Sequence, residues 1–281
     1  MTKNNTFRVS PDCSRRKLIL VPQGGLCNRL RLVLSAFGAL KNGVAPIEIH
    51  WARNAECRAW FEDLFLPVDS EALRIVHRSL WAMPVTLRNL HLPAVLRRLI
   101  GYDLQRADCR PADDAEFYRM ANAGKVYMSG GTTLCSYDAE CLQALRPQPA
   151  IQHSIDEVTA GFSDNTIGVH IRRTDNVVSM RHSTPDGFRR AMDRAVKSDG
   201  NTRFFLATDD HLLKEEMERE YGTRIITRHV SVSRDTVDGM RNAVIDLWCL
   251  AATRRIIGSY WSSFTDTAAE LRDIPLEVVM D

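Results

Sequence analysis

The 281-residue sequence lacks the features that mark membrane, secreted and metal-dependent proteins. No stretch approaches the roughly 20 apolar residues of a membrane span, and the polar N-terminal segment has no apolar core of signal-peptide length. The seven cysteines form neither a CxxC pair nor a metal-ligand spacing with histidine. An odd, dispersed set of cysteines is typical of reduced thiols in a cytosolic protein. We therefore expect a cytoplasmic protein with no transmembrane segment and no metal site.

The sequence also has little excess charge of either sign. Lys and Arg number 37 against 35 Asp and Glu, which leaves a formal net charge of +2. Proteins that bind nucleic acid through their overall field are more basic, so we expect no nucleic-acid partner. Basic residues do gather locally, as at Arg172, Arg173 and Arg181. Local binding of an anion therefore stays open.

The hydrophobic pattern predicts two α/β domains. A polar leader, residues 1–16, precedes a strand, a glycine turn, a helix and a second strand, the start of a βαβ unit. The run RPQP at residues 146–149 interrupts the pattern, so we place an N-terminal domain at 17–149 and a C-terminal domain at 150–281. For the first half we expect strands at 17–22, 47–51, 73–77 and 125–130, and helices at 27–42, 55–65 and 85–101.

The second half alternates strands and helices more plainly. This alternation predicts a parallel sheet covered on both faces. We therefore expect two Rossmann-type, doubly wound domains, with a ligand in the cleft between them. The expected strands are 166–172, 203–208, 224–227 and 255–258, and the expected helices are 184–197, 211–221, 236–252 and 263–271.

The segment IGVHIRRTD, residues 167–175, ends an alternating strand in a group of charges. His170 and Arg172 share one strand face, and Arg173 follows at the carboxyl end, where ligands bind in open α/β sheets. Two guanidiniums beside an imidazole suit a diphosphate. A surface salt bridge at a strand leaving the core is the alternative.

The turn QGGLCNR also ends a strand and begins a helix. Gly24 and Gly25 would let backbone amides face an anion, and Asn28 would lie in the first helical turn. A plain strand-to-helix turn explains the same glycines. The spacing matches neither GxGxxG nor the phosphate-binding loop that ends in Gly-Lys-Ser/Thr, which disfavours a dehydrogenase or a P-loop kinase.

Four further polar residues are candidate ligand contacts. The strand FFLAT ends in two carboxylates, of which Asp210 is suited to capping the next helix, so Asp209 is the functional candidate. Ser262 and Ser263 stand at a predicted helix start, where they can cap the helix and also donate to a phosphate. Asp246 lies in an amphipathic pattern, either on the wet face or held by a specific partner such as the N–H groups of guanine.

In this order the motifs HIRRTD, ATDD followed by LLKE, and the Asp246 helix leading to SSF resemble the α1,6-fucosyltransferases. The resemblance covers residues 166–271, and GGLCNR looks like the glycine turn of the wider fucosyltransferase superfamily. It implies a GT-B-like fold with an acceptor-side first domain and a donor-binding second domain. It further implies GDP-fucose as donor substrate with no separate cofactor, a glycan acceptor, and metal-independent transfer with inversion.

The resemblance also implies roles for single residues. Arg172 matches the arginine that clamps the donor diphosphate, with His170 as the phosphate-contacting histidine and Arg173 and Asp175 as the rest of the motif. Asp246 looks like the carboxylate that recognises guanine. Ser262 or Ser263 looks like the serine that donates to phosphate.

The sequence departs from the family at the base expected for the acceptor hydroxyl. The core α1,6-enzymes place a glutamate shortly after RRTD, where this chain has Met180. Either Asp175, His182 or Asp186 takes the proton, or the transition state is dissociative enough to need no strong base.

Three competing functions stay open. A related transferase would use another nucleotide sugar, and a non-catalytic module would bind nucleotide sugar or glycan without turnover. A phosphate hydrolase using His170 and His182 is the third.

Overall fold

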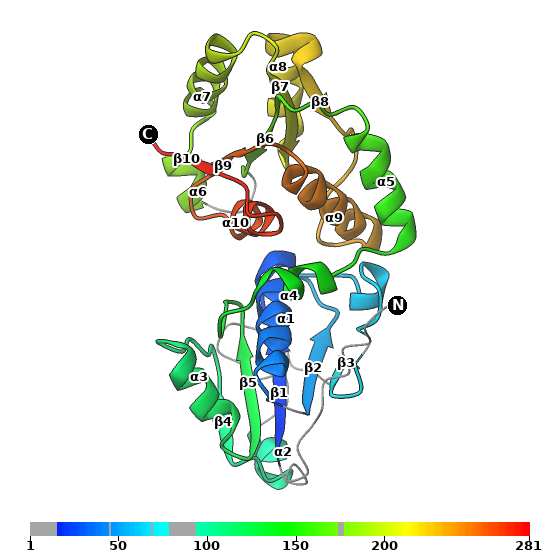
Figure 1. Cartoon of the computed structure of the whole chain (residues 1–281), viewed down its shortest axis with the longest axis vertical. Coiled ribbons are helices and arrows are strands. Elements are labelled where there is room, and N and C mark those ends of the chain that lie inside the picture. The colour runs from blue at the N-terminus through cyan, green and yellow to red at the C-terminus, as the bar shows by residue number, and fades with distance from the viewer. Residues whose placement is uncertain (1–15, 45, 69, 79–93, 174–176) are drawn as a thin grey trace, which may run out of the picture. The chain divides into compact units, whose positions relative to one another are not determined.

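The computed structural model describes residues 16–44, 46–68, 70–78, 94–173 and 177–281. The chain divides into two compact units, Met1–Arg146 and Pro147–Asp281. Each unit is built on a five-stranded sheet whose strands all pair in parallel (Figure 1). The expected α/β class with two Rossmann-type domains is confirmed.

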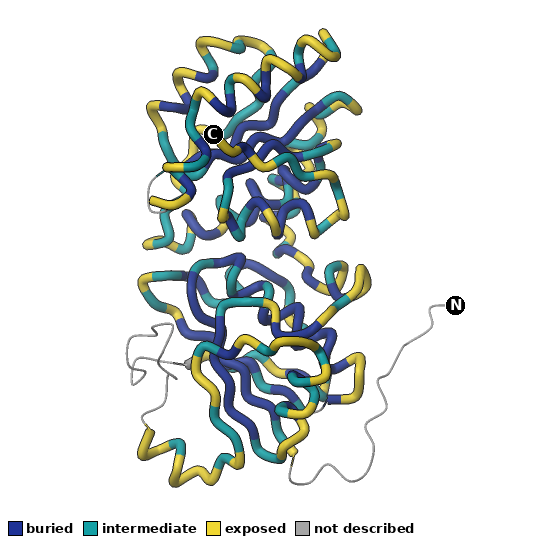
Figure 2. The backbone as a smooth tube through the Cα atoms, turned by 90° about the vertical axis from the view of Figure 1, so that its left-hand side faces the viewer, coloured by how far each residue is buried: buried dark blue, intermediate teal, exposed yellow. Residues whose placement is uncertain are grey.

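The first sheet has the strand order β3-β2-β1-β5-β4. Its core strand β1 is buried along almost its whole length, as an apolar run in a doubly covered parallel sheet should be. Figure 2 shows buried backbone segments in the interior of each unit. The elements are β1 (Lys17–Pro22), α1 (Leu26–Lys41), β2 (Ile47–Ala52), a 3₁₀ turn (Phe61–Asp63), β3 (Leu73–Arg78), α2 (Ala94–Leu99), β4 (Leu104–Arg106), α3 (Asp114–Ala121), β5 (Lys125–Gly130) and α4 (Ala139–Ala144).

The second sheet has the strand order β10-β9-β6-β7-β8. The chain again crosses to the far side of its first strand after completing one half, so the direction of winding reverses between β6 and β9. The elements are α5 (Pro149–Thr159), β6 (Thr166–Ile171), α6 (Val177–His182), α7 (Pro185–Ser198), β7 (Arg203–Thr208), α8 (His211–Tyr221), a 3₁₀ turn (Gly222–Arg224), β8 (Ile225–Thr227), α9 (Val237–Ala251), β9 (Ile256–Ser259), α10 (Ser263–Glu270) and β10 (Leu276–Val279).

Strand β6 is buried on both faces, and its alternation sorts the two faces between different helices. Ile167, Val169 and Ile171 pack into a core formed with α7 and α8. On the other face, a methyl group at Gly168 would meet Thr253 Oγ1 at 2.9 Å and Leu250 at 3.0 Å. The glycine therefore lets the end of α9 lie close against the sheet.

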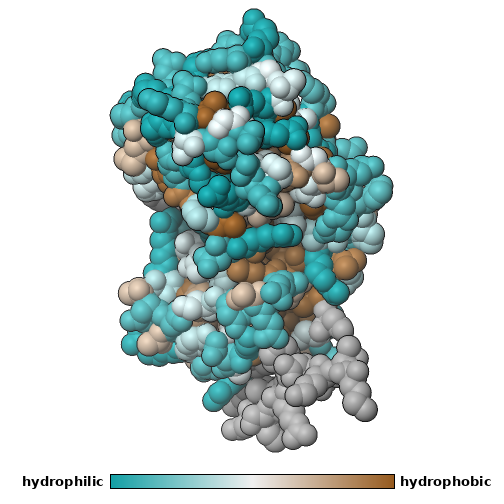
Figure 3. Space-filling model, turned by 45° about the horizontal axis from the view of Figure 1, so that its top comes forward, coloured by the Kyte–Doolittle hydropathy of each residue, from teal (hydrophilic) through white to brown (hydrophobic). Residues whose placement is uncertain are grey.

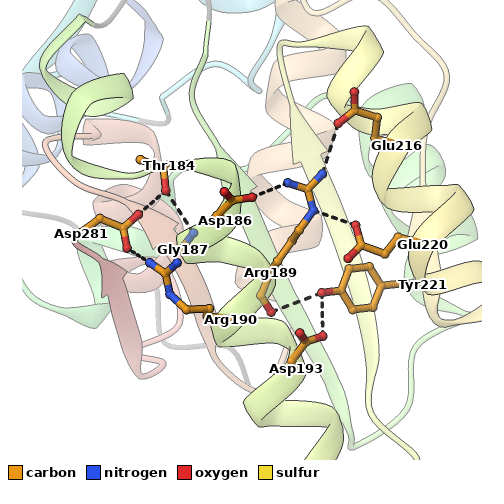
Figure 4. Close-up of polar contacts among 10 residues, drawn as sticks. All are labelled: Thr184, Asp186, Gly187, Arg189, Arg190, Asp193, Glu216, Glu220, Tyr221 and Asp281. Atoms are coloured by element: carbon orange, nitrogen blue, oxygen red, sulfur yellow. Dashed lines mark hydrogen bonds and ion pairs between the residues drawn. The ribbon is translucent and has the colours of Figure 1, made fainter.

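Helix α7 is tied to its neighbours by charge. Arg189 donates to Glu220 at 2.7 Å and to Glu216 at 3.2 Å, both on α8, and Tyr221 OH donates to Asp193 at 2.9 Å (Figure 4). At the start of α7, the carboxylate of Asp281 pairs with Arg190 and accepts from Thr184. The C-terminus is thus fixed to the helix that covers one face of the sheet.

The helix expected over residues 55–65 is wrong. Asn54 and Cys57 exchange two backbone hydrogen bonds of 3.1 Å, which make a tight turn, and only a 3₁₀ turn follows. Trp51 Nε1 donates to Ala59 O at 2.9 Å, so an irregular loop is packed against the sheet. Its apolar side chains are buried although the segment is not helical. Of the helix expected at 85–101, residues 85–93 lie outside the described residues, and α2 occupies part of the rest.

Several elements were not expected from the pattern. Strands β4 and β10 are sheet-edge strands of three and four residues, and both are only partly buried. The division between the two units falls within the run RPQP, whose last residue, Pro149, is the first residue of α5. Proline is favoured there because that position needs no N–H for the helix.

Candidate functional site

The polar residues of the second unit gather where its winding reverses. Open α/β sheets bind ligands at this point, outside the carboxyl ends of the strands. Strand β6 leads into Arg172, its neighbour β9 ends at Ser259, and β7 on the other side leads into Asp209. Sequence reasoning placed these ends together, and the sheet order brings them side by side.

His170 is buried between β6 and α10. Its Nδ1 lies 2.7 Å from Thr265 Oγ1, and its ring stacks on Phe264 with 4.8 Å between centroids. Burial, reinforced by the positive charge of Arg172, lowers the pKa of His170 to about 3. The imidazole is therefore neutral at physiological pH and acts as a hydrogen-bonding group, not as a cation.

Arg172 is held at both its backbone and its side chain. Its N–H donates to Ser259 Oγ at 2.9 Å, and its Nε lies 3.6 Å from Asp209 Oδ2. The other oxygen of Asp209 accepts from Arg173 N at 2.7 Å. Asp209 thus orients the two arginines together. The Arg172 side chain keeps about a fifth of its surface exposed.

Arg173 adds a second, partly buried cationic side chain beside Arg172. Its Nε is buried and has no hydrogen-bond partner within the part of the chain that the structure describes.

Ser259 is a site residue that sequence reasoning missed. Its Oγ also donates to His170 O at 3.3 Å. A Gly-Ser pair at a strand end was the available signal.

Helix α10 begins at the same edge of the sheet. Ser262 is its N-cap and accepts from Thr265 N at 3.4 Å, and Ser263 is its first residue. Helix N-termini attract anions because their first N–H groups have no partner within the helix. Ser262 thus caps α10. Phosphate binding by Ser262 and Ser263 stays a prediction. Asp210 caps α8 as expected, with Leu213 N donating at 3.1 Å.

Asp246 lies in a buried polar cluster, which excludes the wet-face alternative. Arg228 donates to its Oδ1 at 2.9 Å, and both side chains are at most 14% exposed. Lys214 Nζ donates to Arg228 O at 2.7 Å. Burial raises the pKa of Asp246, a shift that the positive charges of Arg228 and Lys214 oppose. Burial lowers the pKa of Lys214, a shift that the charge of Asp246 opposes. Sequence reasoning missed Arg228 and Lys214.

In the first unit, the glycine turn also lies at a reversal of winding, between β1 and β5. Gly24 has φ of 80°, and its N–H donates to Glu56 at 3.0 Å, so a carboxylate of the chain itself occupies this donor. Gly25 is the N-cap of α1, and a methyl group at Gly24 would meet Asn28 Nδ2 at 2.7 Å. Donor binding by Gly24, Gly25 and Asn28 stays a prediction.

Arg29 explains why this turn is so tightly specified. The side chain is fully buried, where it donates to Gly24 O at 2.8 Å, to Ala52 O at 2.5 Å and to Asn54 Oδ1 at 2.8 Å. Its guanidinium also lies 5.2 Å from the ring centroid of Trp51. Burial lowers its pKa, which neighbouring charges partly offset. The residue is structural.

The candidate bases lie in different places. Asp175 lies outside the described residues. Met180 is on α6, and His182 ends that helix with its ring 5.1 Å from Tyr260. Asp186 instead pairs with Arg189 at 2.9 Å on the α7 surface (Figure 4). His182 thus contacts the loop after β9 through the ring of Tyr260.

The described residues include neither a candidate metal site nor a candidate membrane-spanning helix. No group of three or more His, Cys, Asp or Glu is arranged to hold a metal ion among them. Their helices include none with both the length and the apolar character needed to cross a bilayer.

The chain is similar to known proteins in both sequence and fold. The chain is 31% identical over 146 residues to an α-(1,6)-fucosyltransferase of Drosophila melanogaster, covering 45% of this chain and 23% of that protein. The chain thus spans about a quarter of the length of this curated relative. No family model matches it.

Among solved structures, the chain is similar to fucosyltransferase NodZ from Bradyrhizobium, with a TM-score of 0.63 at 18% identity over 92% of each chain. A NodZ α1,6-fucosyltransferase soaked with GDP-fucose gives a TM-score of 0.61 at 16% identity, covering 92% of this chain and 93% of that one. These likenesses show the GT-B fold. Together with the sequence match they confirm the resemblance to α1,6-fucosyltransferases.

Proposed function

We propose that this chain is a GDP-fucose-dependent glycosyltransferase that moves fucose to a glycan hydroxyl, with inversion and without a metal ion. The observation that carries the proposal is the group formed by Arg172, neutral His170, Asp209 and the start of α10 at the reversal between β6 and β9. The similarity to a NodZ enzyme soaked with GDP-fucose supports this donor.

The proposed chemistry centres on the leaving group. Breaking the bond between fucose and GDP builds negative charge on the β-phosphate. Arg172, fixed through Asp209 and Ser259, offers a guanidinium that stabilises this charge without reorganising. Ser262 and Ser263 add donors from the start of α10. His170 is neutral and contributes hydrogen bonds to the same region.

We assign recognition of the base to Asp246. Arg228 donates to Oδ1 of Asp246. The other carboxylate oxygen, Oδ2, would then accept from the N1–H and N2–H₂ groups of guanine. Adenine and uracil lack this pair of adjacent donors, so the carboxylate would favour GDP.

The residue that takes the proton from the acceptor hydroxyl is also part of the proposal. Asp175 is our candidate from the motif, and His182 is the alternative because its ring contacts the loop after β9. Asp186 is held by Arg189 on a helix surface, which makes it the weakest of the three.

We also propose, from the cysteine pattern alone, that the protein is cytoplasmic.

A donor panel tests the proposal. Purified protein is mixed with GDP-fucose, GDP-mannose or UDP-sugars and a set of oligosaccharides, and released nucleoside diphosphate is measured. We expect release from GDP-fucose, and a loss of at least ~10²-fold in kcat for Arg172→Ala, comparable to removing one transition-state donor. Arg194→Ala is the control, because Arg194 is 65% exposed and pairs with Glu277 on the surface. Wild-type kcat in Arg172→Ala would refute the role of Arg172.

The same panel separates the alternatives. Release from a different nucleotide sugar would keep the fold and replace the donor. Calorimetric binding of GDP with no release from any donor would instead indicate a non-catalytic nucleotide-sugar-binding module.

A further inference from the structure

The loop between β9 and α10 presents a tryptophan to solvent in an unusual backbone conformation. Trp261 has φ of 53° and is 72% exposed, the only Trp or Phe side chain within the described residues that is exposed. Hydrophilic side chains predominate on the part of this unit that faces the viewer in Figure 3. A positive φ is rare for a bulky residue, and such strain is concentrated at functional sites.

Hydrogen bonds on both sides hold this conformation in place. Tyr260 N donates to Ser183 Oγ at 2.8 Å, and this buried hydroxyl donates in turn to Val279 O at 2.7 Å. On the other side, Ser262 caps α10. The tryptophan therefore stands between two fixed residues, which makes it a pre-organised contact surface.

The ring is part of an aromatic ridge formed by His182, Tyr260 and Trp261. The ring centroids of His182 and Tyr260 are 5.1 Å apart, and those of Tyr260 and Trp261 are 6.0 Å apart. Tyr260 and Trp261 directly follow Ser259, whose Oγ accepts from Arg172 N. The ridge is thus adjacent to the proposed diphosphate clamp, by which we mean Arg172 with Asp209 and Ser259.

The sheet order decides which part of the reaction the ridge faces. Arg172 follows the central strand β6, whereas Arg228, the partner of Asp246, follows β8 on one side and Trp261 follows β9 on the other. If Asp246 holds the nucleotide base, the ridge lies on the opposite side of the clamp. That is the side toward the transferred sugar and the incoming hydroxyl.

We infer that the ridge of His182, Tyr260 and Trp261 binds a sugar ring of the acceptor glycan, with the ring stacked on the indole of Trp261. The inference rests on the proposed function and adds an acceptor subsite to it. A pyranose has a face of C–H groups and a rim of hydroxyls. A rigid aromatic ring with an N–H at its edge complements both. Trp is also among the residue types that contribute most binding energy at protein interfaces.

Three substitutions separate ring binding from backbone strain. Trp261→Gly removes the ring and relieves the positive φ, whereas Trp261→Ala removes the ring and keeps the strain. Trp261→Phe keeps a smaller ring. Met280→Ala is the control, because Met280 is 61% exposed and lies outside the ridge. Each variant is assayed with GDP-fucose and with chitotriose, cellotriose and maltotriose as acceptors, and its thermal unfolding is recorded.

We expect the Gly and Ala variants to raise the KM for the acceptor equally, by about tenfold or more, despite different melting temperatures. The KM for GDP-fucose and the affinity for GDP should not change, and Phe should give an intermediate value. Saturation transfer from protein to sugar in NMR should weaken in parallel.

Two results would overturn the inference. One is an unchanged acceptor KM in Trp261→Gly, including the case where only the donor KM rises. The other is a wild-type protein that binds none of the three oligosaccharides. Release of GDP from GDP-fucose by the same wild-type sample, including slow hydrolysis without acceptor, tests the proposed function separately.

Discussion

Gly258 allows α10 to lie against β9, and this contact gives a sharp test of how the site is built. A methyl group at this position would overlap the Cγ2 methyl of Thr265 and lie 3.0 Å from its Oγ1. Thr265 is fully buried, and its Oγ1 bonds to His170. Gly258→Ala should therefore push α10 away from the sheet and break this hydrogen bond.

The expected cost follows from these two effects. Overpacking a buried site costs about 1–3 kcal/mol, and loss of a buried hydrogen bond costs about 1 kcal/mol more. We expect Gly258→Ala to lower the free energy of unfolding by about 2–4 kcal/mol. The GDP affinity should fall as well, because the same helix carries Ser262 and Ser263.

A double-mutant cycle isolates the contact. Thr265→Ser removes the overlapping methyl and keeps the hydroxyl, so Gly258→Ala should cost at least about 1 kcal/mol less in that background. Urea unfolding followed by circular dichroism measures each variant. Gly200→Ala is the matched control, since a methyl group there would meet nothing within 4 Å. Additivity of the two substitutions within about 0.5 kcal/mol would refute the reasoning.

Two further predictions concern buried ionisable groups. The pKa of His170 is about 3 in the folded chain and ~6.5 when unfolded, so the unfolded state binds the proton first and stability falls as pH drops from ~6.5 toward 3. Urea titrations should show about 2 kcal/mol of this loss between pH 7 and 5, and a His170→Gln variant with the same pH slope as wild type would contradict it. Asp246→Ala should cost about 3–5 kcal/mol because it leaves Arg228 buried without its carboxylate. Pairing Asp246→Leu with Arg228→Met should recover part of this stability in the same assay, and a loss below about 1 kcal/mol for the single variant would refute a buried ion pair.

The second unit was largely predictable from its sequence because its local signals agree. Its central strands are buried on both faces and read as apolar runs. The helices begin at capping residues that accept from the backbone, as Thr184, Asp210 and Thr236 do. Strand β10 escaped prediction because an edge strand with half-exposed residues has no such pattern.

The first unit shows where sequence patterns mislead. Residues 55–65 have apolar residues at helical spacing, yet they form a loop fixed by the Asn54–Cys57 turn and by Trp51. Burial in that loop comes from contacts with the sheet, which spacing along the chain does not encode.

The site divides in the same way. Strand ends marked His170, Arg172 and Asp209, since parallel strands of one sheet end at a common edge. Arg228, directly after β8, donates to Asp246 on α9, 18 positions later in the chain, so no spacing rule connects the two residues. An acid within an apolar stripe indicates a buried partner without saying which one.

The Glu56 carboxylate at the first glycine turn makes the two reversal points unequal as anion sites. In the first unit, a phosphate seeking the N–H of Gly24 competes with a tethered carboxylate that is always present at high local concentration. Displacing it also removes a negative charge from the surroundings of buried Arg29. The Glu56 carboxylate therefore lowers the affinity of the first turn for dissolved anions. We expect such an anion to bind more tightly at Arg172 and Arg173 of the second unit.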